Sequence, residues 1–196
     1  MKISELLNEQ TATFIGLCRA LKTMILQHAE PQEKRILQDI PIELSSDPLD
    51  WDKIYGLTKS RKIIIDEEEF YDAPREVLIW LIAHELAHML FNHTGQEEPE
   101  LSQQQEMDAD MWANDICKRM NVTKVPVFTW LHRRKDEQGR TELERRQALE
   151  RDPANADFFK GRSHPTIDRR IKQGKDMGIE ISRNTDQIEW LIKHLA

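Results

Sequence analysis

The hydrophobic positions in the first part of the chain recur at intervals of three or four residues. They are Phe14, Leu17, Leu21, Met24 and Ile25. This spacing places them on one face of an amphipathic helix, which we expect to span residues 3–30 and to stop at Pro31. The pattern changes at residues 62–66, where three consecutive isoleucines bounded by charged residues predict a short buried strand.

A long and almost continuously apolar segment follows this strand. Asp72 can cap a helix, Pro74 suits a first helical turn, and apolar residues then continue through Leu90 until Gly95 permits termination. A helix of about 20 residues is about 30 Å long. Because its middle is apolar on all sides, we expect it to lie at the centre of the fold. A second helix is predicted over residues 102–120.

The second half of the chain is more polar. Residues 131–151 contain seven Lys or Arg and five Asp or Glu side chains, which is typical of a solvated helical segment. Apolar periodicity predicts two further helices, over residues 167–177 and 186–195. We therefore expect a predominantly helical α+β fold in a single domain, residues 1–196, with an N-terminal helix at 3–30, a core at 60–120, a charged insert at 131–151 and C-terminal helices at 163–195.

Composition and charge narrow the function classes. The 196 residues include 28 Lys or Arg and 35 Asp or Glu, a formal net charge of −7, so no general binding to nucleic acid is expected. The longest apolar run has seven residues, at positions 77–83, whereas a membrane span needs about 20. With two widely separated cysteines, Cys18 and Cys117, we expect no disulfide scaffold and a cytoplasmic location.

The apolar helix contains the sequence His84-Glu85-Leu86-Ala87-His88. Residues four apart lie on one face of a helix, about 6 Å apart along its axis, so both imidazoles can reach one ion. Glu85 lies about 100° further round, where it can contact a water on the metal without being a ligand. Two histidines and a glutamate among apolar residues are costly to bury without partners. The pattern therefore predicts a divalent metal site.

A tetrahedral catalytic zinc needs a third protein ligand and one open position. Glu106 is the best downstream donor, because the 18 residues after His88 leave room for a loop and an antiparallel return. Asp110 lies one turn beyond Glu106, so it can accept the free ring N–H of His84. Asp108 is the chief competitor for the third position. Zinc is the expected ion, although manganese, iron or cobalt could use the same ligands.

Three segments in this order resemble a known family. They are His84-Glu85-x-x-His88, Glu106-x-x-Ala109-Asp110 and Ser163-His164-Pro165 followed by Arg170-Ile171. Together they resemble gluzincin metallopeptidases of the HtpX and CAAX-prenyl-protease type. The short spacing to Glu106 and the lack of membrane helices also resemble the ImmA/IrrE group of soluble regulatory metallopeptidases. A phage-exclusion protease of the Lit type is a fainter likeness.

The resemblance implies a zincin-like fold and a role for each matched residue. His84, His88 and Glu106 would bind zinc, and Glu85 would be the general base. His164 would stabilise the oxyanion, with Tyr71 and His93 as competitors. Arg170 could pair with Asp110 or lie near Glu106, and a plain surface arginine is the alternative.

The sequence thus predicts a zinc-dependent endopeptidase that cuts an intracellular protein or peptide. A substrate could pair alongside the strand at residues 62–66, gaining main-chain hydrogen bonds. A mobile segment at 131–151 could gate the cleft, and a regulatory partner is conceivable. The alternative is a non-catalytic, zinc-stabilised module that binds proteins or regulates them, although metal binding alone does not require Glu85.

Overall fold

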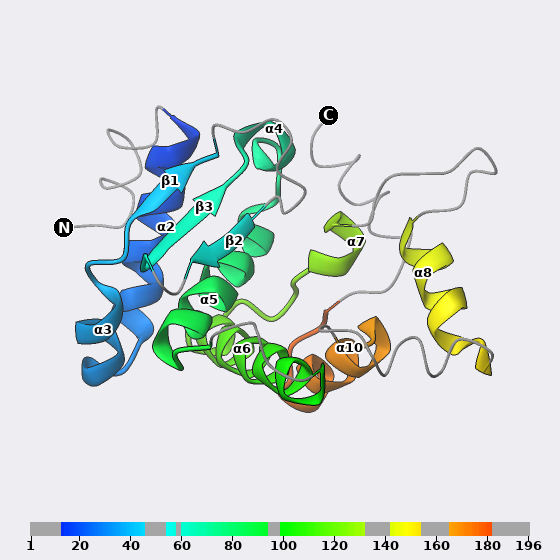
Figure 1. Ribbon diagram of the computed structural model, residues 1–196. Coiled ribbons are helices and arrows are strands. Elements are labelled where there is room, and N and C mark those ends of the chain that lie inside the picture. Colours follow the sequence, from blue (N-terminus) through cyan, green and yellow to red (C-terminus); the bar gives the residue numbers. More distant parts are fainter. Residues whose placement is uncertain are drawn as a thin grey trace.

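Helices dominate the fold, and a small sheet lies on one side of it (Figure 1). The computed structural model describes residues 13–45, 54–57, 60–93, 99–131, 142–153 and 165–181. The elements, in chain order, are α2 (Phe14–His28), α3 (Pro31–Leu37), β1 (Ile42–Leu44), β2 (Ile54–Leu57), β3 (Lys62–Ile65), α4 (Glu67–Phe70), α5 (Arg75–Leu90), α6 (Pro99–Arg119), α7 (Val127–Leu131), α8 (Glu142–Arg151) and α10 (Ile167–Asp176). The predicted α+β class, mainly helical with a small sheet before the His84–His88 helix, is confirmed.

The first described helix is shorter than its hydrophobic pattern suggested. Thr13 adopts an extended conformation and its side chain accepts a hydrogen bond from the N–H of Gly16, so α2 begins at Phe14. It ends at His28, and Pro31 then occupies the first turn of the separate helix α3. The predicted span of 3–30 is therefore corrected to Phe14–His28, and residues 3–12 lie outside the described residues.

The sheet has the order β1-β3-β2, with β1 parallel and β2 antiparallel to β3. Ile63 and Ile65 of β3 are fully buried, whereas Ile64 between them is half-buried, as expected when one face of a sheet is covered. The helices α2 and α5 pack against that face (Figure 1). Because β3 already has a neighbour on each side, the expectation that a substrate pairs alongside residues 62–66 is wrong. The outer strands within the described residues are β1 and β2.

Helix α5 is the centre of the molecule, as its apolar sequence predicted. Every side chain from Val77 to Ala87 is buried, and α5 packs against α2, α3, α6, α7 and two strands. Its bounds differ from the prediction at both ends. Pro74, not Asp72, precedes its first residue, and the chain leaves the helix at Asn92, whose φ of 55° is left-handed, before Gly95 is reached.

The charged segment predicted at 131–151 divides into different parts. Its first residue, Leu131, ends the buried helix α7, residues 132–141 lie outside the described residues, and α8 occupies 142–151. Asp168 at the start of α10 accepts hydrogen bonds from Gln147 and Arg151 of α8 at 2.9–3.2 Å. This polar contact joins α8 to α10. The proposed gating role stays a prediction, which limited proteolysis can test.

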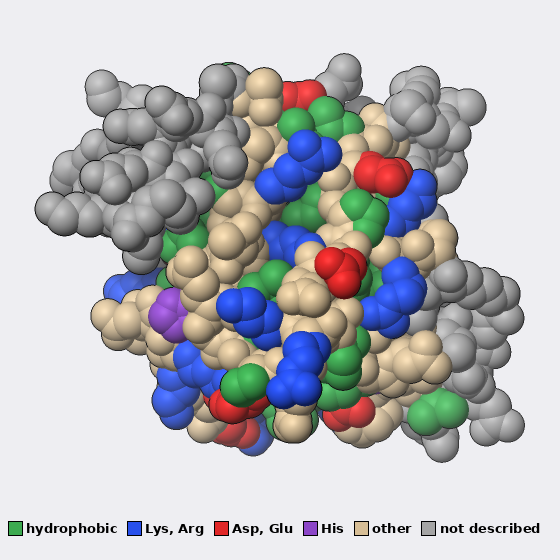
Figure 2. Space-filling view, turned by 90° about the vertical axis from the view of Figure 1, so that its left-hand side faces the viewer, with side chains coloured by type: hydrophobic (Ala, Val, Ile, Leu, Met, Phe, Trp, Pro, Cys, Tyr) green, Lys and Arg blue, Asp and Glu red, His purple; other side chains and the backbone are tan. Residues whose placement is uncertain are grey.

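Figure 2 shows the side of the molecule on which α2, α3 and β1 lie in Figure 1. Hydrophobic side chains form small separate areas there, between Lys, Arg, Asp and Glu side chains. Leu21 and Ile25 of α2 and Ile63 and Ile65 of β3 are buried in the core. Among the described helices, none is both long enough and apolar enough to cross a membrane. The division into a single domain stays a prediction, and the C-terminal helix predicted at 186–195 lies outside the described residues.

Candidate metal centre

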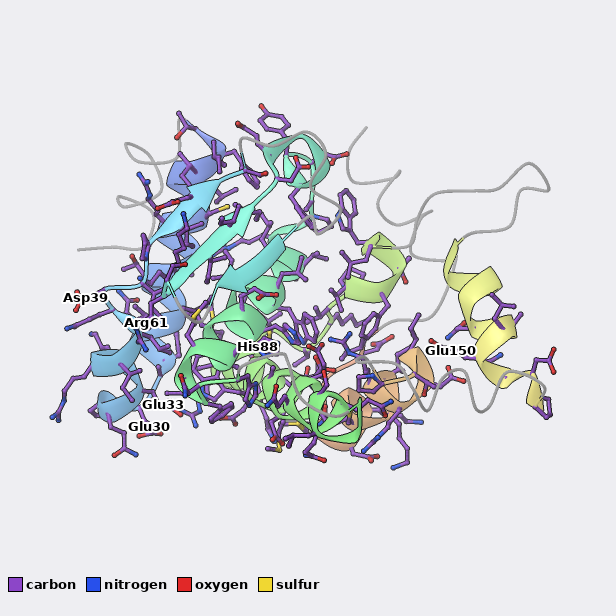
Figure 3. All side chains as sticks on the ribbon, viewed as in Figure 1. Glu30, Glu33, Asp39, Arg61, His88 and Glu150 are labelled. Atoms are coloured by element: carbon purple, nitrogen blue, oxygen red, sulfur yellow. The ribbon has the colours of Figure 1, made fainter. Side chains whose placement is uncertain are left out.

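Three potential ligands from two helices meet at one point. His84 and His88 come from α5 and Glu106 from α6. Figure 3 labels His88, which lies where these two helices pass each other. The Nε2 atoms of His84 and His88 are 3.0 Å apart. The Glu106 carboxylate places one oxygen 3.6 Å from Nε2 of His84 and the other 3.4 Å from Nε2 of His88. The three side chains are 7%, 16% and 13% exposed, so the cluster is open to solvent on only a narrow side.

These separations suit a single small cation. A tetrahedral ion bound at about 2.0–2.1 Å keeps neighbouring ligand atoms about 3.3 Å apart. The observed contacts of 3.0, 3.4 and 3.6 Å lie on both sides of that value. Two imidazoles and one carboxylate are also ligand types that zinc accepts, with a fourth position left for water or substrate.

Side-chain contacts between α5 and α6, repeated every four residues, produce this geometry. His88 lies opposite Glu106, and four residues back along α5 the Nδ1 of His84 lies 2.9 Å from Oδ1 of Asp110. One more turn along, the indole N–H of Trp80 donates to Oδ1 of Asn114 at 2.9 Å. Contacting residues are thus four positions earlier on α5 for every four positions later on α6, as expected for two antiparallel helices. Ala109 and Ala113, both fully buried on α6, allow the close approach.

Arg170 of α10, a third helix at the cluster, contacts two carboxylates there. Its guanidinium donates two hydrogen bonds of 2.6 Å to the two carboxylate oxygens of Asp110, and it lies 3.9 Å from Glu106. The Asp110 side chain is 1% exposed and that of Arg170 14%. Burial alone would raise the pKa of Asp110, but the charge and hydrogen bonds of Arg170 outweigh it and the pKa is lowered. Asp110 therefore stays ionised opposite His84.

The two histidines have opposite protonation tendencies in the absence of a metal. Burial works to lower the pKa of His84, but the hydrogen bonds and charges of Asp110 and Glu106 exceed it and raise the pKa to about 10. Burial lowers the pKa of His88 to about 3, aided by the positive charge of His84. At neutral pH, His84 thus holds the proton that lies between the two Nε2 atoms, and a metal ion would have to displace it.

Aromatic rings line the inner side of the cluster. The indole of Trp80 stacks on the His84 ring, with centroids 5.2 Å apart and planes 19° apart. The Arg170 guanidinium lies over the rings of Phe128 and Trp80, at 5.0 and 5.7 Å. Trp80, Phe128 and Asn114 were not among the residues that the sequence predicted for the site. The signal for two of them was present, because Trp80 is four residues before His84 and Asn114 four residues after Asp110.

Glu85 is buried beside the cluster, with 9% of its surface exposed, and its negative charge contributes to raising the pKa of Arg170 after Asp110 and Glu106. Around the two histidines there are thus three carboxylates and one guanidinium, which leave two negative charges once the proton on His84 has been displaced. A divalent cation would neutralise them.

The other candidate residues differ in their relation to this cluster. Tyr71 is 73% exposed and precedes α5, whose first residue lies nine positions before His84, about 13 Å along the axis. Asp108 accepts a hydrogen bond from Gln104 at 2.9 Å and does not belong to the group of three ligands, although its charge acts on His93. His93 contacts His88 from the side away from Glu106, through Nδ1. His164 lies outside the described residues.

The family comparison agrees with this geometry. The model of the family described as Peptidase U49 matches residues 66–186, which is more than half of the chain. The chain belongs to this family. The match includes α5, α6 and α10, and with them every residue of the cluster described above. Membership indicates a peptidase, which acts on proteins or peptides. No curated protein and no solved structure matches the chain.

Proposed function

We propose that the protein is a zinc-dependent endopeptidase that hydrolyses peptide bonds of an intracellular protein. The observation that supports this most strongly is the buried cluster of His84, His88 and Glu106, whose ligand atoms are spaced as a tetrahedral ion requires. Metal-assisted hydrolysis of peptide bonds would explain both the membership in a peptidase family and the divalent-ion site. Cys18 and Cys117 are both buried and unpaired, which fits a reducing compartment.

The residues of the cluster have distinct tasks. His84, His88 and Glu106 would hold the ion, while Asp110 keeps the His84 ring oriented so that Nε2 faces the other ligands. When bound there, zinc lowers the pKa of a coordinated water to about 7 and polarises a substrate carbonyl. Arg170 keeps Asp110 ionised and in place through its paired hydrogen bonds.

Glu85 is the proposed general base. It follows His84 directly on α5, so its carboxylate projects about 100° round the helix from that ligand, beside the cluster. In this position it accepts a proton from the attacking water and later transfers it to the amine of the departing peptide. Its low exposure limits competition from bulk water.

The test compares Glu85→Gln with the wild type on a pool of peptides derived from cellular proteins, both loaded with zinc. Glu76→Gln, in the first turn of the same helix, is the matched control. We expect Glu85→Gln to keep zinc and to lose at least about 100-fold in rate, because general base catalysis typically contributes that much. Glu76→Gln should cleave like the wild type.

Two results would contradict the proposal. Equal cleavage by wild type and Glu85→Gln would remove the proposed base. Tight zinc binding without cleavage by either protein would favour the alternative function, a zinc-stabilised binding or regulatory module.

A further inference from the structure

We propose that His93 is a positioning residue that fixes the ring orientation and tautomer of His88 and so strengthens metal binding by the cluster. This inference rests on the proposed function, because it concerns the same ion. It assigns a task to a side chain that the hydrolytic mechanism above does not use.

The contact between the two rings is short and directional. Nδ1 of His88 lies 2.9 Å from Nδ1 of His93, and the rings meet edge to face, with centroids 5.0 Å apart at 73°. His93 is 9% exposed, and the Phe91 ring lies on it with a centroid distance of 5.5 Å. The His93 ring is therefore held in place on more than one side.

The chemistry of the contact determines where the protons lie. Nε2 of His88 faces His84 and Glu106, and it must be unprotonated to bind an ion. The remaining ring proton of His88 then sits on Nδ1, where Nδ1 of His93, at 2.9 Å, is placed to accept it. His93 in turn must accept with Nδ1 and have its own proton on Nε2.

With this contact, the outer ring nitrogen of each ligand histidine has a partner. The outer nitrogen of a metal-binding histidine usually donates to a carboxylate, a carbonyl or water. Asp110 is that partner for His84, and His93 takes the equivalent position for His88. The two ligands therefore differ, since one is supported by a buried anion and the other by a neutral ring.

The backbone at the end of α5 delivers His93 to this place. The helix ends at Leu90 with Phe91 as its C-cap, Asn92 follows with a φ of 55°, and the N–H of His93 donates to the carbonyl of His88 at 3.0 Å. This is the six-to-one hydrogen bond of a Schellman turn, which needs a left-handed residue at the position of Asn92. Asparagine tolerates that conformation better than most residues. The turn thus folds the chain back so that the His93 ring meets His88.

The first experiment measures zinc affinity by competition with a chelator for wild type, His93→Phe and His93→Gln. Phenylalanine retains a ring but cannot accept a hydrogen bond, whereas glutamine offers an amide oxygen. We expect His93→Phe to weaken zinc binding by about 10–100-fold and His93→Gln to recover part of the loss. His28→Phe, at the exposed end of α2, is the control and should bind zinc like the wild type.

A second measurement uses the wild type alone, so it does not depend on whether a variant folds. Nitrogen-15 NMR of the zinc-loaded wild type should show the ring proton of His88 on Nδ1 and that of His93 on Nε2. A proton on Nδ1 of His93, or wild-type zinc affinity in His93→Phe, would overturn the positioning role. If zinc binding and Glu85-dependent cleavage persist in that case, only this inference fails. If the wild type binds no zinc, the proposed function fails together with it.

Discussion

Replacing Arg170 with methionine removes the cation that Asp110 faces in the interior. Methionine keeps an unbranched apolar side chain at this position but has no hydrogen-bond donor. Asp110, with 1% of its side chain exposed, would lose both hydrogen bonds of 2.6 Å and have only His84 to compensate its charge. The change therefore isolates the role of a contact between residues 60 positions apart in the sequence.

The expected cost follows from this burial. Removing one partner of a buried ion pair typically destabilises a protein by about 3–5 kcal/mol, because the other charge stays uncompensated. For a chain of this size each kcal/mol lowers the thermal midpoint by about 2–4 °C, so we expect a decrease of roughly 6–20 °C.

The destabilisation should depend on pH. Since the pKa of Asp110 is lowered in the folded state, its stabilising contribution is present above about pH 3.9 and is lost as pH falls through the folded pKa. The difference between variant and wild type should shrink there.

The assay is urea unfolding of the metal-free proteins in the presence of a chelator, at pH 7 and at successively lower pH. Arg169→Met is the matched control, because Arg169 is the exposed neighbour on the same helix, and its loss should cost less than about 0.5 kcal/mol. A cost for Arg170→Met below about 1 kcal/mol at pH 7, or one equal to that of the control, would refute the reasoning.

Three further outcomes test other parts of the structure. Zinc binding to the metal-free protein near pH 7 should release at least one proton per chain, because His84 keeps its proton up to a pKa of about 10 and a coordinated water with a pKa of about 7 releases a further fraction. The apparent affinity should then rise by at least about tenfold per pH unit between pH 7 and 9, and calorimetry in buffers of different ionisation enthalpy that finds no released proton contradicts this. Gly174→Ala should destabilise by about 1–3 kcal/mol in urea, because the added Cβ would overlap the buried side chain of Ile181; unchanged stability would mean that Ile181 moves aside freely. Lys22→Met should cost about 1–3 kcal/mol, because the buried ammonium donates to two main-chain carbonyls just after α3. Lys34→Met, at an exposed position of α3, is its control, and equal costs would contradict a special role of Lys22.

The sequence was sufficient to predict the parts of the site that depend on helical spacing. His84 and His88 lie one turn apart on one helix, and Glu106 and Asp110 one turn apart on another, so each pair shares a face wherever the helices lie. The central position of α5 followed from its apolar residues on all sides. These conclusions needed only the geometry of a single helix.

Contacts that depend on tertiary packing could be predicted only in part. That Arg170 lies next to Asp110 was one of three open alternatives, since nothing local determines where α10 packs. The central place of β3 between two strands was missed, because a run of isoleucines does not reveal its neighbours. The left-handed turn at Asn92 was also missed, because Gly95 gave the more obvious stop signal. That turn brings His93 to His88.

X-ray absorption at the zinc edge, with the zinc content of the same samples, tests the proposed metal centre most directly. The wild type loaded with one zinc per chain should show nitrogen and oxygen neighbours at about 2.0–2.1 Å, with outer-shell scattering from two imidazoles. In His88→Ala one imidazole should disappear and the zinc content should fall. A wild type that retains no zinc, or a bound zinc whose neighbours include no imidazole, would contradict a centre built from His84, His88 and Glu106.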